Sequence, residues 1–159
     1  FGKDWAWRGF FDVLGMRKVV FEEDLKGAPL GGSYVFATPR DFARFGYLFL
    51  RDGCWQGARL LPEGWVATST TPSASFSSST LATQDTPNGW MWWLNPAAGP
   101  VKEKPWKDAP DDAYSAIGHW GQYVVVIPSA DVVIVRTGDD RNQSIDLSPL
   151  ISLSLAVAK

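Results

Sequence analysis

Cysteine and histidine are almost absent from the sequence, which contains one of each among its 159 residues. Because Cys54 has no partner thiol, no disulfide can form within the chain, and both reducing and oxidising compartments remain open. A single histidine and a single cysteine also exclude the common zinc-binding patterns. We therefore predict neither a metal site nor any other cofactor.

Excess charge and long apolar runs are lacking too. The formal net charge of -2 gives no basic footprint for nucleic acid or for an anionic membrane, so neither is predicted as a partner. No apolar stretch reaches the roughly 20 residues that cross a bilayer. The opening residues FGKDWAWRGFF contain no initiator methionine and no long apolar core, so we expect neither a signal peptide nor a natural gene start there.

Tryptophan, in contrast, is abundant, with nine residues and a total aromatic content of 14%. This abundance indicates either a large aromatic core or a surface that binds rings and sugars. The hydrophobic content of 45% and the charged content of 20% are ordinary for a globular domain. The length is sufficient for one domain with a sizeable core.

The clearest predicted element is a helix that starts after Thr38. Thr38 can cap it, Pro39 suits the first helical position, and Gly53 can end it in a left-handed conformation. Apolar residues recur at helical spacing at Phe42, Phe45, Leu48 and Phe49. A shorter helix is expected after Pro62, with Trp65 and Val66 facing inward. Two further helices are expected, one stopped by Gly15 and one closing the chain after Pro149.

At least three strands are predicted, over residues 89–94, 122–128 and 131–138. The last two are β-branched runs separated by a tight turn, and their continuous apolar character favours central strands covered on both faces. We expect at least two of the three tryptophans in GWMWWL to lie in the core. Residues 71–89 are predicted to be an irregular loop, and residues 95–113, with four prolines, a long connection. The fold class is α+β, with helices packed on a mostly antiparallel sheet.

The only histidine lies in GHWGQ, directly before an apolar strand. Flanking glycines let the backbone approach another chain segment or a ligand closely. Exposed N–H groups at a strand end can stabilise an oxyanion, and a neighbouring imidazole can orient a substrate. The alternative is a histidine satisfied by local hydrogen bonds. The local sequence leaves both open.

Two blocks considered together resemble a known family. GGSYVFATPRDFARFGYLFLRDGCWQGARLLPEGWV, followed by GHWGQYVVVIPSADVVIVRTG, is similar to the β-lactamase-like and penicillin-binding-protein-like serine hydrolases, most of all to the class C β-lactamase and esterase branch. The resemblance runs from about Leu14 to the C-terminus. It implies that residues 1–159 are a single partial domain, the C-terminal half of a β-lactamase-like α/β/α domain.

The resemblance also implies roles for individual residues. His119, Trp120 and Gly121 match the third motif of the family in its His-x-Gly form, and the backbone N–H of Gln122 would be one of two oxyanion donors. Trp120 would help to shape the substrate site. Ser33 in GGSY would line the cleft, although the same residues also suit a tight turn. The loop TGDDRN is expected on the cleft rim.

Two family motifs are missing. No serine is followed three residues later by lysine, and no tyrosine two residues later by asparagine, so the chain lacks the nucleophile and base for acyl transfer. The resemblance therefore implies a serine hydrolase of esters, amides or β-lactams whose nucleophile-bearing half is absent here. An esterase or amidase is favoured over a β-lactamase, because histidine replaces the lysine of Lys-Thr-Gly.

Partners and location follow from the same resemblance. The expected partner is a small-molecule acyl substrate, and we expect the isolated chain to associate with the missing N-terminal half or with itself, because cutting the sheet exposes an edge. Family members are often periplasmic or secreted. The alternative function is a tryptophan-rich module that binds carbohydrate or another ligand without catalysis.

Overall fold

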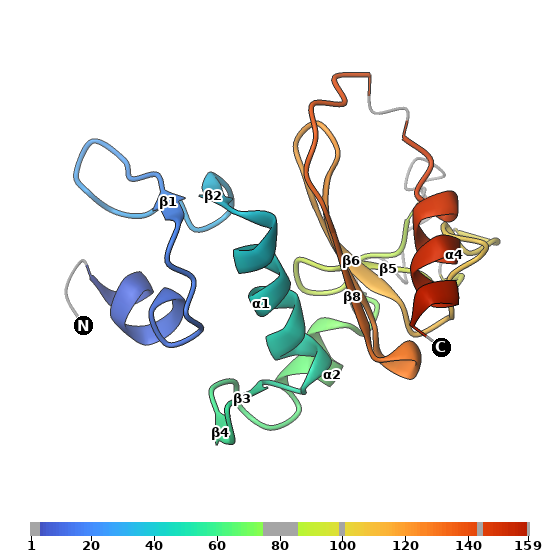
Figure 1. The fold of residues 1–159 in the computed structure, drawn as a ribbon, viewed down its shortest axis with the longest axis horizontal. Coiled ribbons are helices and arrows are strands. Elements are labelled where there is room, and N and C mark those ends of the chain that lie inside the picture. Colours follow the sequence, from blue (N-terminus) through green and yellow to red (C-terminus); the bar gives the residue numbers. More distant parts are fainter. Residues whose placement is uncertain (1–3, 75–85, 99–100, 143–144, 159) are drawn as a thin grey trace.

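The computed structural model describes residues 4–74, 86–98, 101–142 and 145–158. Its central feature is an antiparallel sheet in the order β5 (Trp93–Leu94), β6 (Tyr114–Gly118), β7 (Gln122–Ile127) and β8 (Val132–Arg136). Helix α1 (Pro39–Leu50) covers one face of this sheet and α4 (Ser148–Val157) covers the other (Figure 1). The predicted α+β class, with helices on a mostly antiparallel sheet, is confirmed.

Helix α1 forms where its sequence signals predicted. The Thr38 hydroxyl oxygen accepts a hydrogen bond from the Asp41 backbone N–H (3.2 Å) and donates one to the Asp41 carboxylate (2.8 Å). These two bonds satisfy one free donor of the first helical turn and fix the capping side chain. Gly53 has a φ of +79°, and its N–H reaches the Leu48 carbonyl (2.8 Å), which ends the helix as predicted.

The two faces of β7 pack into different hydrophobic clusters. Val125 and Ile127 belong to a cluster that includes Ile151 of α4, whereas Val126 packs with Phe49 of α1 and with Trp92. Alternate side chains of a strand point to opposite faces, so burial on both sides explains the continuous apolar run. Within the described residues, β8 is an edge strand, whereas the apolar pattern predicted a central position for it as well.

A second, smaller layer lies on the far side of α1. It consists of η1 (Trp7–Phe11), a π-helical turn, and the hairpin of β1 (Val19–Phe21) and β2 (Val35–Ala37). Their apolar side chains form a cluster with Leu48 of α1. The predicted helix before Gly15 is therefore shorter than expected: it ends at Phe11, and Gly15 lies in the following turn with a φ of +68°.

Three other predictions about elements need correction. Helix α2 (Trp65–Ser69) begins after Gly64, not at Pro62, and Trp65 is exposed instead of facing inward. The strand expected over residues 89–94 comprises only Trp93 and Leu94, because Met91 has a left-handed backbone (φ 66°) that breaks an extended chain. Strand β6 was not singled out from the sequence. Of the loop predicted over residues 71–89, residues 75–85 lie outside the described part.

A short hairpin and a turn complete the description. β3 (Cys54–Trp55) and β4 (Ala58–Arg59) form a short hairpin after α1, and η2 (Pro128–Ala130) is the turn between β7 and β8.

Trp92 is buried and Trp93 packs against the core, so two of the three tryptophans of GWMWWL are core residues as predicted.

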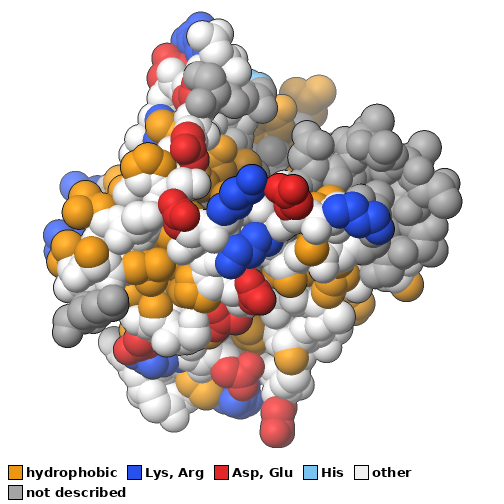
Figure 2. All heavy atoms as spheres, turned by 90° about the vertical axis from the view of Figure 1, so that its right-hand side faces the viewer, with side chains coloured by type: hydrophobic (Ala, Val, Ile, Leu, Met, Phe, Trp, Pro, Cys, Tyr) orange, Lys and Arg blue, Asp and Glu red, His pale blue; other side chains and the backbone are white. Residues whose placement is uncertain are grey.

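The surface is chemically mixed. In Figure 2, acidic and basic side chains are interspersed with hydrophobic ones on the visible face. Across the described residues, no helix is both long and apolar enough to cross a membrane.

Candidate active site

The predicted site residues His119, Trp120 and Gly121 form the turn between β6 and β7. Gly118 and Gln122 face each other as the last pair of the ladder, so His119 lies in a hairpin turn and does not open a strand. Trp120 and Gly121 both have positive φ values, 58° and 80°. Short hairpin connections require such left-handed residues. A Cβ on Gly121 would lie 2.6 Å from the Arg136 guanidinium, so a larger residue would displace that side chain.

The side chain of Gln122 stabilises this turn through hydrogen bonds. Its Nε2 donates to the carbonyls of His119 (3.2 Å) and Trp120 (3.3 Å) and also to the carbonyl of Gly138. Its Oε1 accepts a hydrogen bond from the Gly138 N–H (3.1 Å). The family resemblance implied a role only for the backbone N–H of Gln122. The structure adds a side chain that joins the turn to the segment after β8.

Arg136 is a second support that the sequence analysis missed. Its guanidinium Nη1 donates to the carbonyl of Gly121, and the backbone of Gly138 approaches the same group so closely that a Cβ would lie 2.9 Å away. The available signal was a charged residue that ends the apolar run VVIVR. Because the half-buried Arg136 spans both segments, it restricts the path of the turn.

The loop after β8 packs against the same turn. The Asp140 N–H donates to the Trp120 carbonyl (2.9 Å), and the Arg141 guanidinium lies 4.4 Å from the centre of the Trp120 ring. This distance is within the range of cation–π interactions. Arg141 is also held by Asp139 (3.0 Å). The structure thus brings TGDDRN beside His119–Gly121, while its place on a substrate cleft stays a prediction.

His119 and Trp120 present two rings to solvent. Their centroids are 4.6 Å apart with an interplanar angle of 35°, and both residues are exposed. Hydrogen bonds from Gln122 and Arg136 hold the backbone of the turn, so the positions from which the two rings project are restricted. Such an arrangement can contact and orient a substrate, but it provides no nucleophile.

Ser33 is not brought to this turn. It lies in the connection between β1 and β2, where its N–H donates to the Leu30 carbonyl (3.0 Å). In Figure 1 this connection and the β6–β7 turn lie on opposite sides of α1. The local geometry matches the tight turn considered as the alternative, and the cleft-lining role of Ser33 stays a prediction. The described residues contain no group of three or more His, Cys, Asp or Glu side chains suited to a metal ion.

Comparison with known families identifies the chain. Residues 3–142 match the family described as Beta-lactamase. The chain belongs to the beta-lactamase family. A comparison with curated protein sequences gave no significant match.

Solved structures of beta-lactamase-like proteins share the fold. A protein described as a 6-aminohexanoate-dimer hydrolase from Bacillus anthracis aligns with a TM-score of 0.69 and 21% identity, over 96% of this chain and 37% of its own. A beta-lactamase from Mycobacterium bovis aligns with a TM-score of 0.63 and 19% identity, over 98% and 56%. A protein described as a beta-lactamase from Bacteroides dorei gives 0.55 and 16%, over 95% and 49%. The chain thus spans about a third to just over half of their lengths.

Proposed function

We propose that this chain forms the C-terminal part of a serine hydrolase domain and supplies one wall of its acyl-transfer site. The observation that carries the proposal is the β6–β7 turn: in a chain of the beta-lactamase family, the side chains of His119 and Trp120 are exposed, while Gln122 and Arg136 fix the backbone of the turn. The nucleophile and the base, which this sequence lacks, belong in the proposal to polypeptide outside it.

The proposed mechanism is transfer of an acyl group through a covalent intermediate. A serine from a Ser-x-x-Lys motif attacks the substrate carbonyl and passes its proton to the lysine or to a tyrosine. The carbonyl oxygen becomes an oxyanion that accepts hydrogen bonds from the Gln122 N–H and from the N–H of that serine. The alcohol or amine leaves with the returned proton, and water then releases the acid. His119 and Trp120 contact the substrate.

The proposed substrates are esters or amides in preference to β-lactams. His119 occupies the position where the class C-like relatives have the lysine of Lys-Thr-Gly, so the cation that holds a β-lactam carboxylate is missing from that position. The Bacillus anthracis neighbour is described as a 6-aminohexanoate-dimer hydrolase, and two aminohexanoate units joined through an amide bond support the amide option. The branch of the family and the limits of the domain are parts of the same proposal.

The tryptophan-rich binding module is not favoured. Such a module needs exposed indoles in a common plane, yet Trp92 and Trp106 are buried. The exposed pair Trp65 and Trp90 is nearly perpendicular, with an interplanar angle of 86°. This geometry is an edge-to-face contact between two protein side chains, not a flat platform for a sugar ring.

The proposal is tested by the activity of the complete polypeptide, meaning this chain together with the sequence encoded directly upstream. We expect hydrolysis of a p-nitrophenyl ester, and His119→Ala should lower kcat/KM about 10- to 100-fold through loss of substrate positioning. The control is Lys107→Ala, which removes an exposed side chain paired with Glu103. An active enzyme that His119→Ala leaves unchanged would contradict the assignment of the turn.

A further inference from the structure

A cavity of about 320 Å³ lies at the opposite end of β6 from the candidate active site. Tyr114, the first residue of β6, lines it, whereas His119 follows the last residue of that strand. At about 3.3 Å per residue, the two positions are roughly 16 Å apart along the strand. The cavity is therefore separate from the acyl-transfer site, and its volume is at the lower end for ligand pockets.

The Tyr114 hydroxyl is the unusual feature of this cavity. Tyr114 is 3% exposed, and within the described part of the chain its hydroxyl has no hydrogen-bond partner. Its ring is held edge-to-face by Trp92, with centroids 4.9 Å apart. A buried hydroxyl without a partner is costly and rare in folded proteins. A ligand in the cavity that bonds to this oxygen removes that cost.

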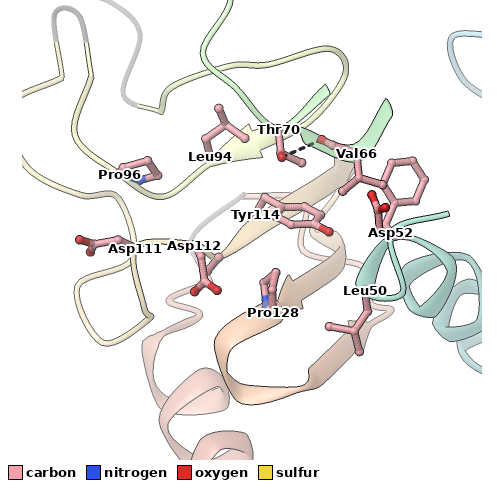
Figure 3. Close-up of a pocket in the computed structure, with 12 residues that line it drawn as sticks. Leu50, Asp52, Val66, Thr70, Leu94, Pro96, Asp111, Asp112, Tyr114 and Pro128 are labelled. Carbon is pink, nitrogen blue, oxygen red and sulfur yellow. Dashed lines mark hydrogen bonds between the residues drawn. The ribbon is translucent and has the colours of Figure 1, made fainter. Parts of the chain in front are cut away.

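Two carboxylates lie on opposite sides of the Tyr114 ring (Figure 3). Figure 3 shows the Tyr114 hydroxyl directed toward the side of the cavity where Asp52 lies, with Asp112 on the other side of the ring. Burial, together with the charges of Asp112 and Asp52, raises the pKa of Tyr114 above its usual range, so the hydroxyl stays protonated. Asp111 also lines the cavity, and its carboxylate pairs with Lys104 (3.2 Å).

Both carboxylates keep acceptor capacity. Asp112 accepts from the Ser129 N–H (2.6 Å) and hydroxyl (2.8 Å), one bond to each oxygen. One oxygen of Asp52 accepts from Arg59 (3.2 Å). A carboxylate offers about four lone-pair sites, so each can accept another hydrogen bond. The existing bonds hold the two side chains in place and leave lone pairs available for a ligand.

The rest of the lining restricts the ligand further. Among the described residues, no lysine or arginine lines the cavity, and the carboxylates repel an anion. The walls between the polar groups are aliphatic, with Leu50, Leu94, Pro96 and Pro128 among them. A metal ion would prefer an oxygen-rich shell to these walls. An ammonium group can donate to the Tyr114 oxygen while the nearby carboxylates balance its charge, and a short alkyl chain suits the apolar walls.

We propose that the cavity bounded by Tyr114, Asp52 and Asp112 is a second binding site, which takes a small primary amine as its ammonium ion. The ammonium group donates to the Tyr114 oxygen, the negative charges of Asp52 and Asp112 attract it, and the alkyl chain lies against the leucines and prolines. The site is independent of the acyl-transfer chemistry, so its test stands apart from that of the proposed function.

The test is a titration of the 159-residue chain with n-hexylammonium, followed by two-dimensional NMR of the backbone amides. We expect saturable shifts at Asp52, Ala113 and Tyr114, with a Kd on the order of 1 mM for so small a ligand. The neutral analogue 1-hexanol should bind at least about tenfold more weakly, because it carries one donor and no charge. Equal binding of hexanol and hexylammonium, or no saturable shift, would overturn the proposal.

Variants separate the site from non-specific attraction. Tyr114→Phe keeps the ring packing and removes the hydroxyl, and it should weaken binding about threefold to tenfold without lowering Tm. Asp112→Asn should also weaken binding. Because Asp112 also holds Ser129, Asp52→Asn tests the effect of a carboxylate without disturbing that contact. The matched control is Asp4→Asn, which removes an exposed carboxylate near the N-terminus. Equal loss of binding in Asp4→Asn would show general charge attraction and contradict the proposal.

Discussion

The side chain of Gln122 connects the β6–β7 turn to the segment after β8. Its amide nitrogen faces the carbonyls of His119, Trp120 and Gly138. Gln122→Glu replaces this donor with an oxygen of the same size, and carboxylate and carbonyl oxygens then face each other. We expect the free energy of unfolding to fall by about 1–3 kcal/mol, measured by urea denaturation.

A matched variant isolates the donor in this experiment. Gln122→Met keeps the length of the side chain and loses both hydrogen-bonding atoms, so it should cost less than Gln122→Glu, which adds repulsion. If Gln122→Glu were as stable as the natural chain, the amide nitrogen would not hold the turn.

Asp41 gives a pH dependence at the start of α1. It is 3% exposed, and burial by itself would raise its pKa. The hydrogen bonds from the Thr38 hydroxyl and the Lys18 N–H, together with the charge of Arg44, outweigh burial and hold the pKa below its usual value. Because the folded pKa is lower than the unfolded one, the carboxylate stabilises the fold above pH about 4.

This stability should be lost as the pH falls below about 4 and through the lowered pKa of Asp41. The measurement is Tm from pH 7 to pH 2 for the natural chain and for Asp41→Asn, which cannot titrate. The variant should be less stable at pH 7, and the gap should narrow in acid. A constant gap across this range would show that the charge of Asp41 contributes nothing.

At the scale of elements, the contact of α1 with the sheet depends on Gly46. A Cβ there would lie 2.6 Å from a methyl group of Val133 and 2.9 Å from one of Val124. Gly46→Ala gains about 1 kcal/mol of helix propensity but forces the helix away from β7 and β8. We expect a net destabilisation of about 1–3 kcal/mol, measured by thermal unfolding.

Gly9→Ala is the control for Gly46→Ala. Gly9 lies in η1, and a Cβ there would meet nothing within 4 Å, so this change should be neutral or slightly stabilising. Equal effects of the two substitutions would contradict the close approach of α1 to the sheet.

Local signals predicted the elements that depend on local structure. Helix α1 has its cap, its apolar stripe and its terminal glycine within 16 consecutive positions, Thr38 to Gly53, and each acts within a turn or two. Strand β6 has no such pattern, since YSAIG alternates neither in size nor in polarity. It is a strand because it pairs with β7 and β5, and pairing is not visible in one segment alone.

The candidate active site also combines features visible in a short sequence segment with contacts between distant segments. The glycines around His119 indicated a strand end, and the family resemblance pointed to the same residues. The hydrogen bonds of Gln122 and Arg136 join positions 16 and 15 residues apart, so no short motif records them. The exposure of Trp65 was missed for a related reason: its partner, Trp90, is 6.0 Å away in space but distant in sequence.

At the scale of the whole molecule, the four-stranded sheet has an open edge. Among the described strands, β8 pairs only with β7, and large apolar side chains such as Val20 and Phe36 of the β1–β2 hairpin are exposed by 61% and 55%. Unpaired edges and exposed apolar side chains favour association. We expect the isolated chain to self-associate or to bind the upstream polypeptide, as measured by sedimentation velocity.

The dependence of sedimentation on protein concentration tests whether the chain self-associates. The sedimentation coefficient should rise with protein concentration and change again when the upstream polypeptide is added. A monodisperse monomer at every concentration, with or without that polypeptide, would contradict the expectation.

The measurement that tests the central claim most directly is the intact mass of this chain after exposure to a fluorophosphonate probe, which labels activated serines. The claim is that the chain carries a wall of a serine hydrolase site without the nucleophile. It predicts no adduct on the chain alone and one adduct, on the partner, when the upstream polypeptide is present. A stoichiometric adduct on a serine of the isolated chain would contradict the claim and move the active site to that serine.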